Sequence, residues 1–214
     1  MSTVRTILKQ FGPLRRAVLK RRQAGGIFGQ SDEAQILRRL VDASDAPRTF
    51  IEFGFHPAEF NCAALVTDHA GLLIDGDAHQ VADARRSLSA SIRVEHCFMT
   101  LDNLDLIRDA FPRLGVLSID VDGNDYWFLE ALIALAPTVI AVECNASLVG
   151  HGVTVPYDPA FDRHAKHSWG WYHGASLAAL HTLAARHGYG LAAVAKGGGN
   201  AFFTREGNLD PATA

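Results

Sequence analysis

Apolar residues gather in short runs separated by amphipathic segments, and this pattern predicts alternating strands and helices. The runs lack a polar face, which is typical of parallel strands covered by helices on both sides. The predicted strands are residues 49–54, 71–75, 92–99, 116–119 and 138–143. The predicted helices are residues 31–43, 59–67, 79–90, 103–111 and 126–135. Elements that alternate at roughly 10 to 20 residue spacing imply right-handed crossovers and a largely parallel sheet.

The C-terminal part of the chain predicts a different ending for this sheet. A helix at residues 176–187 precedes two strand-like segments, 189–195 and 200–204, which Lys196 and three glycines separate. Glycines between two apolar runs favour a hairpin. The alternative is a phosphate-binding loop, but such a loop precedes the first turn of a helix, and here a strand-like segment follows. We therefore predict an α/β, Rossmann-like, doubly wound fold with a mostly parallel seven-stranded sheet and an antiparallel C-terminal hairpin.

Composition and charge favour a single soluble domain. The 214 residues are 48% apolar and 20% charged, enough for one sizeable core, and a net charge of −3 gives no general reason to bind nucleic acid. Cys62, Cys97 and Cys144 lie in apolar contexts without metal-ligand spacing, so we expect reduced thiols and a cytoplasmic location. No stretch approaches the ~20 apolar residues of a membrane span, and the layout of a signal peptide is missing.

The two ends of the chain differ from its middle. Residues 1–30 predict a basic helical arm and linker, residues 31–206 the α/β domain, and residues 207–214 a flexible tail. The basic amphipathic face of the arm favours packing on its own domain or on a partner subunit, so a homodimer is a reasonable expectation. Binding to a membrane surface or a polyanion is the alternative.

An acidic segment follows the fourth predicted strand. The apolar run stops at Asp120, and Asp122, Gly123, Asn124 and Asp125 come directly after it. Ligands of open α/β sheets bind at the carboxyl ends of the strands, so this cluster lies where a site is expected. A turn with Asp125 capping the next helix is the simpler interpretation of that residue. Neighbouring carboxylates repel one another, however, and such a set needs a cation or several donors.

Several stretches, in this order, resemble one enzyme superfamily. They are F-I-E-F-G at 50–54, G-L-L-I-D-G-D at 71–77, L-S-I-D-V-D-G-N-D-Y-W at 117–127, V-E-C-N at 142–145, G-A-S-L-A-A-L at 174–180 and N-A-F-F-T-R at 200–205. With five βα units and a final hairpin, they resemble the class I S-adenosylmethionine-dependent methyltransferases over residues 31–204. More narrowly they are similar to FkbM-type bacterial proteins, in which a Q-x-x-E/D segment precedes the first strand, as Gln30 to Glu33 does here.

The resemblance implies S-adenosylmethionine as cofactor and a set of residues that hold it. The implied cofactor-binding residues are Glu52, Gly54, Asp75, Asp102, Asn103 and Asp120. In the family the first acid and glycine hold the methionine end, and the acid after the second strand accepts the ribose hydroxyls. Two simpler interpretations stay open. In one, Asp75 forms an Asp-Gly turn and Asp77 binds the ribose in its place, and in the other, Asp102-Asn103 is a helix cap. The family's glycine-rich first loop reads Gly54-Phe55-His56-Pro57 here.

Acids from two neighbouring strand ends are expected to converge over the transferable methyl group. Asp120, Asp122 and Glu143 form an oxygen-rich set that suits a hard ion such as Mg²⁺, which could lower the pKa of a bound hydroxyl. Direct hydrogen bonding to a sugar or an amine without metal is the alternative. We expect Asp122, Asn124 and His173 to be catalytic, with His173 as the base. His151 and His164 are the alternative bases.

The sequence thus supports one leading function and two rivals. The leading function is S-adenosylmethionine-dependent methylation, most directly at oxygen, of a small molecule or glycan, with acceptor specificity in the irregular segment 145–173. The first rival is an inactive or non-methyltransferase relative whose acidic cleft binds a ligand or partner. The second is a membrane- or polyanion-associated accessory protein, which rests on the basic arm alone.

Overall fold

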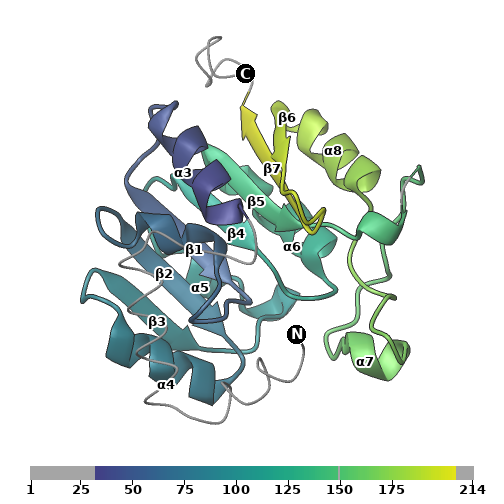
Figure 1. Ribbon diagram of the computed structural model, residues 1–214, viewed down its shortest axis with the longest axis horizontal. Coiled ribbons are helices and arrows are strands. Elements are labelled where there is room, and N and C mark those ends of the chain that lie inside the picture. Colours follow the sequence, from purple (N-terminus) through teal and green to yellow (C-terminus); the bar gives the residue numbers. More distant parts are fainter. Residues whose placement is uncertain (1–31, 149, 206–214) are drawn as a thin grey trace.

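The computed structural model describes residues 32–148 and 150–205, and in this part of the chain a seven-stranded sheet forms the centre (Figure 1). The strand order is β3-β2-β1-β4-β5-β7-β6. The pairs from β3 through β5 are parallel, whereas β7 runs antiparallel to both β5 and β6. The predicted fold class, including the antiparallel hairpin at the end, is confirmed.

The predicted strands are all present, with small changes at their ends. Their bounds are β1 Thr49–Phe53, β2 Ala70–Asp75, β3 Ile92–His96, β4 Val116–Ile119, β5 Val139–Glu143, β6 Tyr189–Val194 and β7 Asn200–Arg205. The third strand was predicted to reach residue 99 but ends at His96. Its last residue pairs with Asp75, where β2 itself ends, so the next residues have no strand beside them.

The helices agree less closely with the pattern. Their bounds are α3 Glu33–Asp42, α4 Ala78–Ser87, α5 Asp105–Arg108, α6 Asp125–Leu132, α7 Arg163–Lys166 and α8 Leu177–Arg186, with 3-10 turns η1 Asn61–Leu65, η2 Leu101–Asn103, η3 Ile133–Leu135 and η4 Ala146–Leu148. The helices predicted at 59–67 and 103–111 are wrong in extent. Phe60 is extended, so the first begins at residue 61 as a 3-10 turn. Pro112 disfavours helical backbone at the residue before it, which limits the second.

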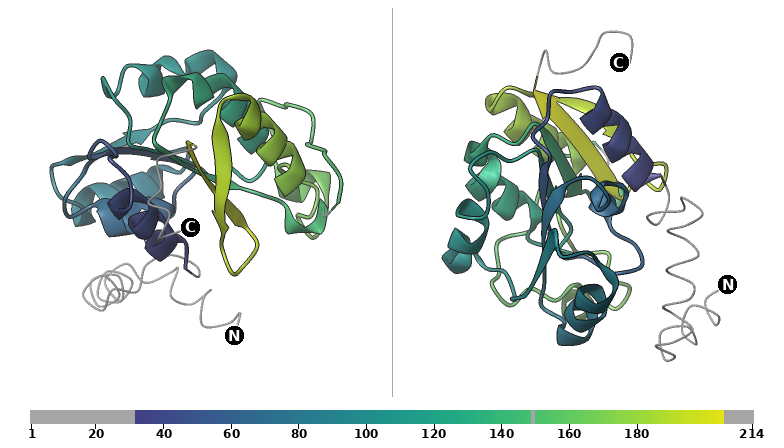
Figure 2. Two further views of the ribbon diagram at one scale, coloured as in Figure 1. Left: turned by 90° about the horizontal axis from the view of Figure 1, so that it is seen from above. Right: turned by 90° about the vertical axis from the view of Figure 1, so that its left-hand side faces the viewer.

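Both faces of the sheet are covered (Figure 2). Elements α3, η1 and α4 pack on one face, and α5, α6 and α8 pack on the other. Strand β1 contributes to both faces. Phe50 packs in the core with α3, η1 and α4, whereas Ile51 and Phe53 pack in the core with α5, α6 and α8. Each fully buried side chain of this kind stabilises the fold by about 1.5–3 kcal/mol relative to an exposed one. The apolar runs of the sequence are nearly uninterrupted because the strands are buried on both faces.

The irregular segment 145–173 is held against the carboxyl ends of the strands. Trp127 Nε1 on α6 donates to the carbonyl of Val155 at 2.9 Å, and the backbone N–H of Leu101 donates to the Tyr157 hydroxyl at 3.0 Å. Asn124 exchanges two hydrogen bonds with the backbone of Asp158. These contacts fix a long loop that carries α7 beside the sheet (Figure 1).

Three expectations concern the outer parts of the chain. The helix expected from Ser31 begins at Glu33, after Asp32 at its N-cap. The basic arm at residues 1–30 and the tail at 207–214 lie outside the described residues. Among the helices of residues 32–148 and 150–205, none is long and apolar enough to cross a membrane.

Candidate functional site

A cavity of about 1340 Å³ opens at the carboxyl ends of β1, β2, β4 and β5. Its walls include Gly54 after β1, Asp75 at the end of β2, Asp120 after β4 and Glu143 at the end of β5. The parallel arrangement of these strands brings the four residues to one edge of the sheet, as the sequence predicted. This is the edge at which ligands of open α/β sheets bind.

The loop after β1 requires its glycine. Gly54 has φ +77°, and a Cβ atom there would lie 1.7 Å from the carbonyl oxygen of Asp120. The bulky residue that follows, Phe55, belongs to the cavity wall and is buried in the core formed with α3 and α4, where its ring lies 6.1 Å from that of Phe60. The loop therefore packs against the backbone of Asp120, directly after β4, and the cavity lies beside this contact.

Glu52 does not line this cavity, which corrects its predicted contact with a cofactor. Its side chain is 1% exposed, and its two oxygens accept the backbone N–H groups of Asn61 at 2.8 Å and Cys62 at 2.7 Å. Burial raises the pKa of Glu52, and these two hydrogen bonds oppose the rise. Glu52 therefore anchors the start of η1, and its carboxylate is not available to a ligand.

Asp75 is the better placed of the two acids after β2. It lines the cavity and accepts the backbone N–H of Asp77 at 2.7 Å, and burial raises its pKa. Asp77 caps α4, since its Oδ1 accepts the N–H groups of His79 and Gln80. The structure keeps Asp75 as the candidate for hydroxyl recognition and gives Asp77 a structural role.

Asp102 and Asn103 lie away from the cavity, which corrects their predicted cofactor contact. Asn103 accepts the N–H of Thr100 at 2.9 Å and donates to the carbonyl of Phe98 at 3.0 Å, whereas Asp102 is exposed. The helix-cap interpretation holds only in part, because Thr100 is the N-cap of η2, Asn103 is its capping-box partner, and Asp102 contributes its backbone N–H to the Thr100 side chain. The cavity wall after β3 consists instead of Cys97, Phe98 and Met99.

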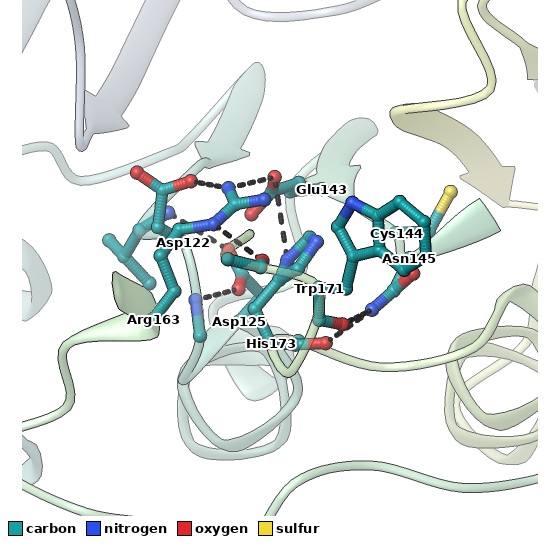
Figure 3. A network of polar contacts seen from close by, with 12 residues as sticks. Asp122, Asp125, Glu143, Cys144, Asn145, Arg163, Trp171 and His173 are labelled. Atoms are coloured by element: carbon teal, nitrogen blue, oxygen red, sulfur yellow. Dashed lines mark hydrogen bonds and ion pairs between the residues drawn. The ribbon is translucent and has the colours of Figure 1, made fainter. Parts of the chain in front are cut away.

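The positive charge that the acidic cluster needs comes from Arg163 on α7 (Figure 3). Its Nη1 contacts a carboxylate oxygen of Asp122 and lies 3.7 Å from Oε1 of Glu143, while its Nε donates to the carbonyl of Gly170 at 3.0 Å. A planar guanidinium suits such a position between two carboxylates. The segment 145–173 thus supplies a charged side chain to the site, as well as its cover.

The predicted Mg²⁺ site is not found. In residues 32–148 and 150–205, no group of three His, Cys, Asp or Glu side chains is arranged to hold a metal ion. Of the three predicted ligands, Asp122 and Glu143 contact the guanidinium of Arg163, and Asp120 lies beside them on the cavity wall. The guanidinium of Arg163 thus pairs with two of the three acids that were predicted to bind a metal ion, and it neutralises part of the charge of the cluster.

Burial and crowding perturb the acids of this cluster. Burial, followed by the charge of Glu143, raises the pKa of Asp120 well above its ordinary value. Burial also raises the pKa of Glu143, with Asp125 adding to the effect and Arg163 opposing it. Such shifts mark carboxylates that carry more negative charge than their surroundings neutralise.

Asp125 holds the turn between β4 and α6. It is fully buried and accepts the N–H groups of Val121 and Gly123, both at 2.9 Å. Burial, opposed by these hydrogen bonds, raises its pKa to about 6. The prediction that Asp125 caps a helix starting at residue 126 is wrong, because α6 begins at Asp125 itself with Asn124 at its N-cap, and the Asp125 carboxylate holds the turn that precedes the helix.

Two asparagines hold the loop and do not face a ligand with their amides. Asn124 donates to the carbonyl of Asp158 at 2.8 Å, so its predicted catalytic role is corrected to a structural one. Asn145 donates to the carbonyls of Trp171 and His173 at 3.0 and 2.9 Å (Figure 3). Both amides therefore fix the segment that carries His173 and Arg163.

His173 lies on the cavity wall beside Glu143. The side chain is 8% exposed, and its Nδ1 lies 3.7 Å from Oε1 of Glu143. Nδ1 of His173 and Oε2 of Glu143 are buried, and within residues 32–148 and 150–205 neither atom has a hydrogen-bond partner. Burial lowers the pKa of His173, so the ring is neutral near pH 7. The alternative bases, His151 and His164, are exposed and do not line this cavity.

Sequence reasoning missed Arg163 and two of the aromatic residues of the wall, Phe98 and Phe161. The repulsion among the acids indicated that some cation was required. The sequence did not indicate which one, because the nearest candidate in space is 41 positions from Asp122.

The chain is similar to solved structures in fold, at low sequence identity. One is an O-methyltransferase from Bacillus cereus in complex with SAH (S-adenosylhomocysteine), with a TM-score of 0.52, 14% identity and 88% of each chain covered. Another is the N-terminal domain of EvdMO1 with SAH bound, with a TM-score of 0.51, 12% identity, and 89% of this chain and 96% of that one covered. The structure of the same domain in the presence of SAH and D-fucose has a TM-score of 0.50 and 12% sequence identity to this chain. No family model and no curated protein matches the sequence.

Proposed function

We propose that the protein is an S-adenosylmethionine-dependent methyltransferase that acts at an oxygen atom of a small molecule or glycan. The observation that carries the proposal is one continuous cavity that joins Gly54 and Asp75 to Asp120, Glu143 and His173. Its volume of about 1340 Å³ exceeds the roughly 300–1000 Å³ of a typical pocket for one ligand, so cofactor and acceptor fit together. The similar folds solved with SAH, and the FkbM-type resemblance of the sequence, agree with this proposal.

The residues present fit the cofactor in two places. Asp75 accepts the ribose hydroxyls, and the backbone at Gly54 allows the methionine end to approach closely. Asp120 is a buried acid on the cavity wall, and the negative charge of its ionised form favours a cationic sulfur over a neutral one. When bound, S-adenosylmethionine supplies an electrophilic methyl group.

Glu143 and His173 act on the acceptor. An acceptor hydroxyl about 2.8 Å from Nδ1 of His173 donates to that nitrogen, and Oε1 of Glu143 lies 3.7 Å from the same nitrogen. The neutral imidazole takes the hydroxyl proton at Nδ1, and the carboxylate of Glu143 lies beside the imidazolium that forms. The oxygen then forms its bond to the methyl carbon as the carbon–sulfur bond breaks. Asp122 acts as a positioning residue, since its carboxylate holds Arg163.

Native mass spectrometry of the protein mixed with millimolar SAH tests the proposal. We expect one bound molecule for each chain, and prior incubation with S-adenosylmethionine should reduce that signal. Protein that stays free of ligand at this concentration would instead support a relative in which the cleft binds something else.

A further inference from the structure

We propose that the acceptor is cationic, a ring-shaped polyol that carries a protonated amine next to the hydroxyl to be methylated, as an amino sugar does. The amine is placed against Oε2 of Glu143, and the hydroxyl is placed against Nδ1 of His173. This inference rests on the proposed function and names the substrate class of the same cavity.

The first observation is the charge of the cavity wall. The carboxylates that line it belong to Glu33, Glu59, Asp75, Asp77, Asp120, Asp122 and Glu143. Among the described residues of the wall, Arg163 is the one lysine or arginine side chain. Glu33 and Glu59 have further contacts of their own, so the balance is drawn over Asp75, Asp77, Asp120, Asp122 and Glu143. S-Adenosylmethionine carries a net charge of about +1, and together with Arg163 it offsets only part of the negative charge of these five acids when they are ionised. A cationic acceptor is therefore attracted to this cavity, and an anionic acceptor is repelled.

The second observation is a pair of buried atoms without partners. Oε2 of Glu143 and Nδ1 of His173 have no hydrogen-bond partner in the described part of the chain, and His173 is more than nine-tenths buried. Burial raises the pKa of Glu143, whereas an ammonium group beside Oε2 lowers it and supplies three N–H donors to the ionised carboxylate, which only accepts hydrogen bonds. The neutral imidazole accepts from a hydroxyl. An amine and a hydroxyl on adjacent carbons supply both donors at once.

Arg163 shows how cations are received at this position. Its guanidinium already contacts Asp122 and approaches Glu143, which shows that the two acids are spaced to share one positive group (Figure 3). A phosphate or carboxylate that approached Arg163 would meet the same two acids within a few ångströms. Arg163 is thus a counter-ion of the cluster and a poor anchor for an anion.

The shape of the wall favours a ring. Phe98 is 61% exposed and lines the cavity together with Phe161. These two residues, with Val121, Asp122 and Arg163, also line an adjoining hollow of about 590 Å³. A pyranose-like ring presents a face of C–H groups that packs on an aromatic side chain, while its edge carries the polar groups. The hollow gives room for a substituent on that ring.

Calorimetric titration of SAH-loaded protein with glucosamine, glucose and glucuronate tests the inference. These probes share one ring and differ in charge. We expect glucosamine to bind at least tenfold more tightly than glucose, with a difference that shrinks as salt is added, and glucuronate to bind least. Equal affinities, tighter glucuronate, or no heat from glucosamine would overturn the inference. SAH binding is measured first, so its loss would identify failure of the proposed function itself.

Two variants and a control separate charge from shape. Glu143→Gln should bring the preference for glucosamine over glucose to within about threefold, because the retained amide has a similar shape and no charge. Arg163→Ala should increase the affinity for glucosamine several-fold, whereas an anion anchor would lose affinity for glucuronate. Glu95→Gln on β3, outside the cavity wall, should leave the ratio unchanged. A Glu143→Gln protein that kept the full preference would contradict the inference.

Discussion

Nδ1 of His173 lies 3.7 Å from Oε1 of Glu143 at the wall of a large acidic cavity, and no other residue described in the chain partners that nitrogen. The gap is too long for a direct hydrogen bond and suits one bridging oxygen atom. The two residues come from distant parts of the sequence, β5 and the end of the segment 145–173. Their approach gives the site a base and a neighbouring negative charge.

Replacing His173 tests its role as the base. His173→Gln should lower kcat by about 10²–10⁴-fold while SAH binding changes little, because a glutamine amide cannot take the proton. In the wild type, kcat/KM should rise with pH and level off above a midpoint lower than 6.5, since burial lowers the pKa of His173. The pH profile of the variant should lose this inflection. An inflection that persisted in His173→Gln would assign the base to another residue.

Removing Arg163 should destabilise the fold. Arg163→Ala leaves Asp122 and Glu143 without their cation, and we expect unfolding to require about 1–2 kcal/mol less free energy. The loss is smaller than for a fully buried pair, because the Asp122 side chain is 62% exposed. Urea denaturation measures this loss. Arg108→Ala, which removes an exposed ion pair with Asp105, is the control and should lower the free energy of unfolding by about 0.5 kcal/mol or less. Equal effects of the two variants would show that the cluster does not need this cation.

Asp125 should make the fold less stable as the pH rises. Its pKa is about 6 in the folded state against an ordinary 3.8, so the folded protein binds the proton more tightly than the unfolded chain. This contribution is fully present below pH 3.8 and is lost as the pH rises through about 6. The loss amounts to on the order of 3 kcal/mol. In Asp125→Asn, urea denaturation between pH 4 and 7 should show a flatter dependence, and an unchanged slope would contradict the assignment.

Glu52 should matter for stability more than for binding. Glu52→Gln replaces one acceptor oxygen by an amide donor that faces the N–H of Asn61 or Cys62, which costs about 1–3 kcal/mol. The melting temperature should fall, while the affinity for SAH should change by less than threefold because Glu52 lies outside the cavity wall. A loss of SAH affinity without a loss of stability would restore the cofactor contact that the sequence resemblance implied.

The strand pattern was readable from the sequence because burial on both faces leaves a direct record in residue type. The run from Val116 to Ile119 is apolar except for Ser118 and stops before Asp120, and β4 has these bounds. The short elements were harder. The turn η1 depends on the carboxylate of Glu52, which lies nine positions earlier, and no local periodicity records such a contact.

The candidate site was predicted only in part, for a related reason. Asp75, Asp120 and Glu143 end three parallel strands, so the topology alone brings them together. Asp102 and Asn103 depend on how a loop closes, and there the local capping pattern was the better guide. Arg163 comes from an irregular segment whose position is set by tertiary contacts, so its pairing with Asp122 could not be derived from spacing.

Calorimetric titration of SAH into three proteins tests the central claim most directly. The wild type should bind one equivalent, and Asp75→Asn should bind at least tenfold more weakly, since it loses a charged acceptor for the ribose hydroxyls. Asp102→Asn, an exposed change away from the cavity wall, should match the wild type. Failure of the wild type to bind at millimolar SAH, or equal binding by all three proteins, would contradict the account of this cavity as a cofactor site.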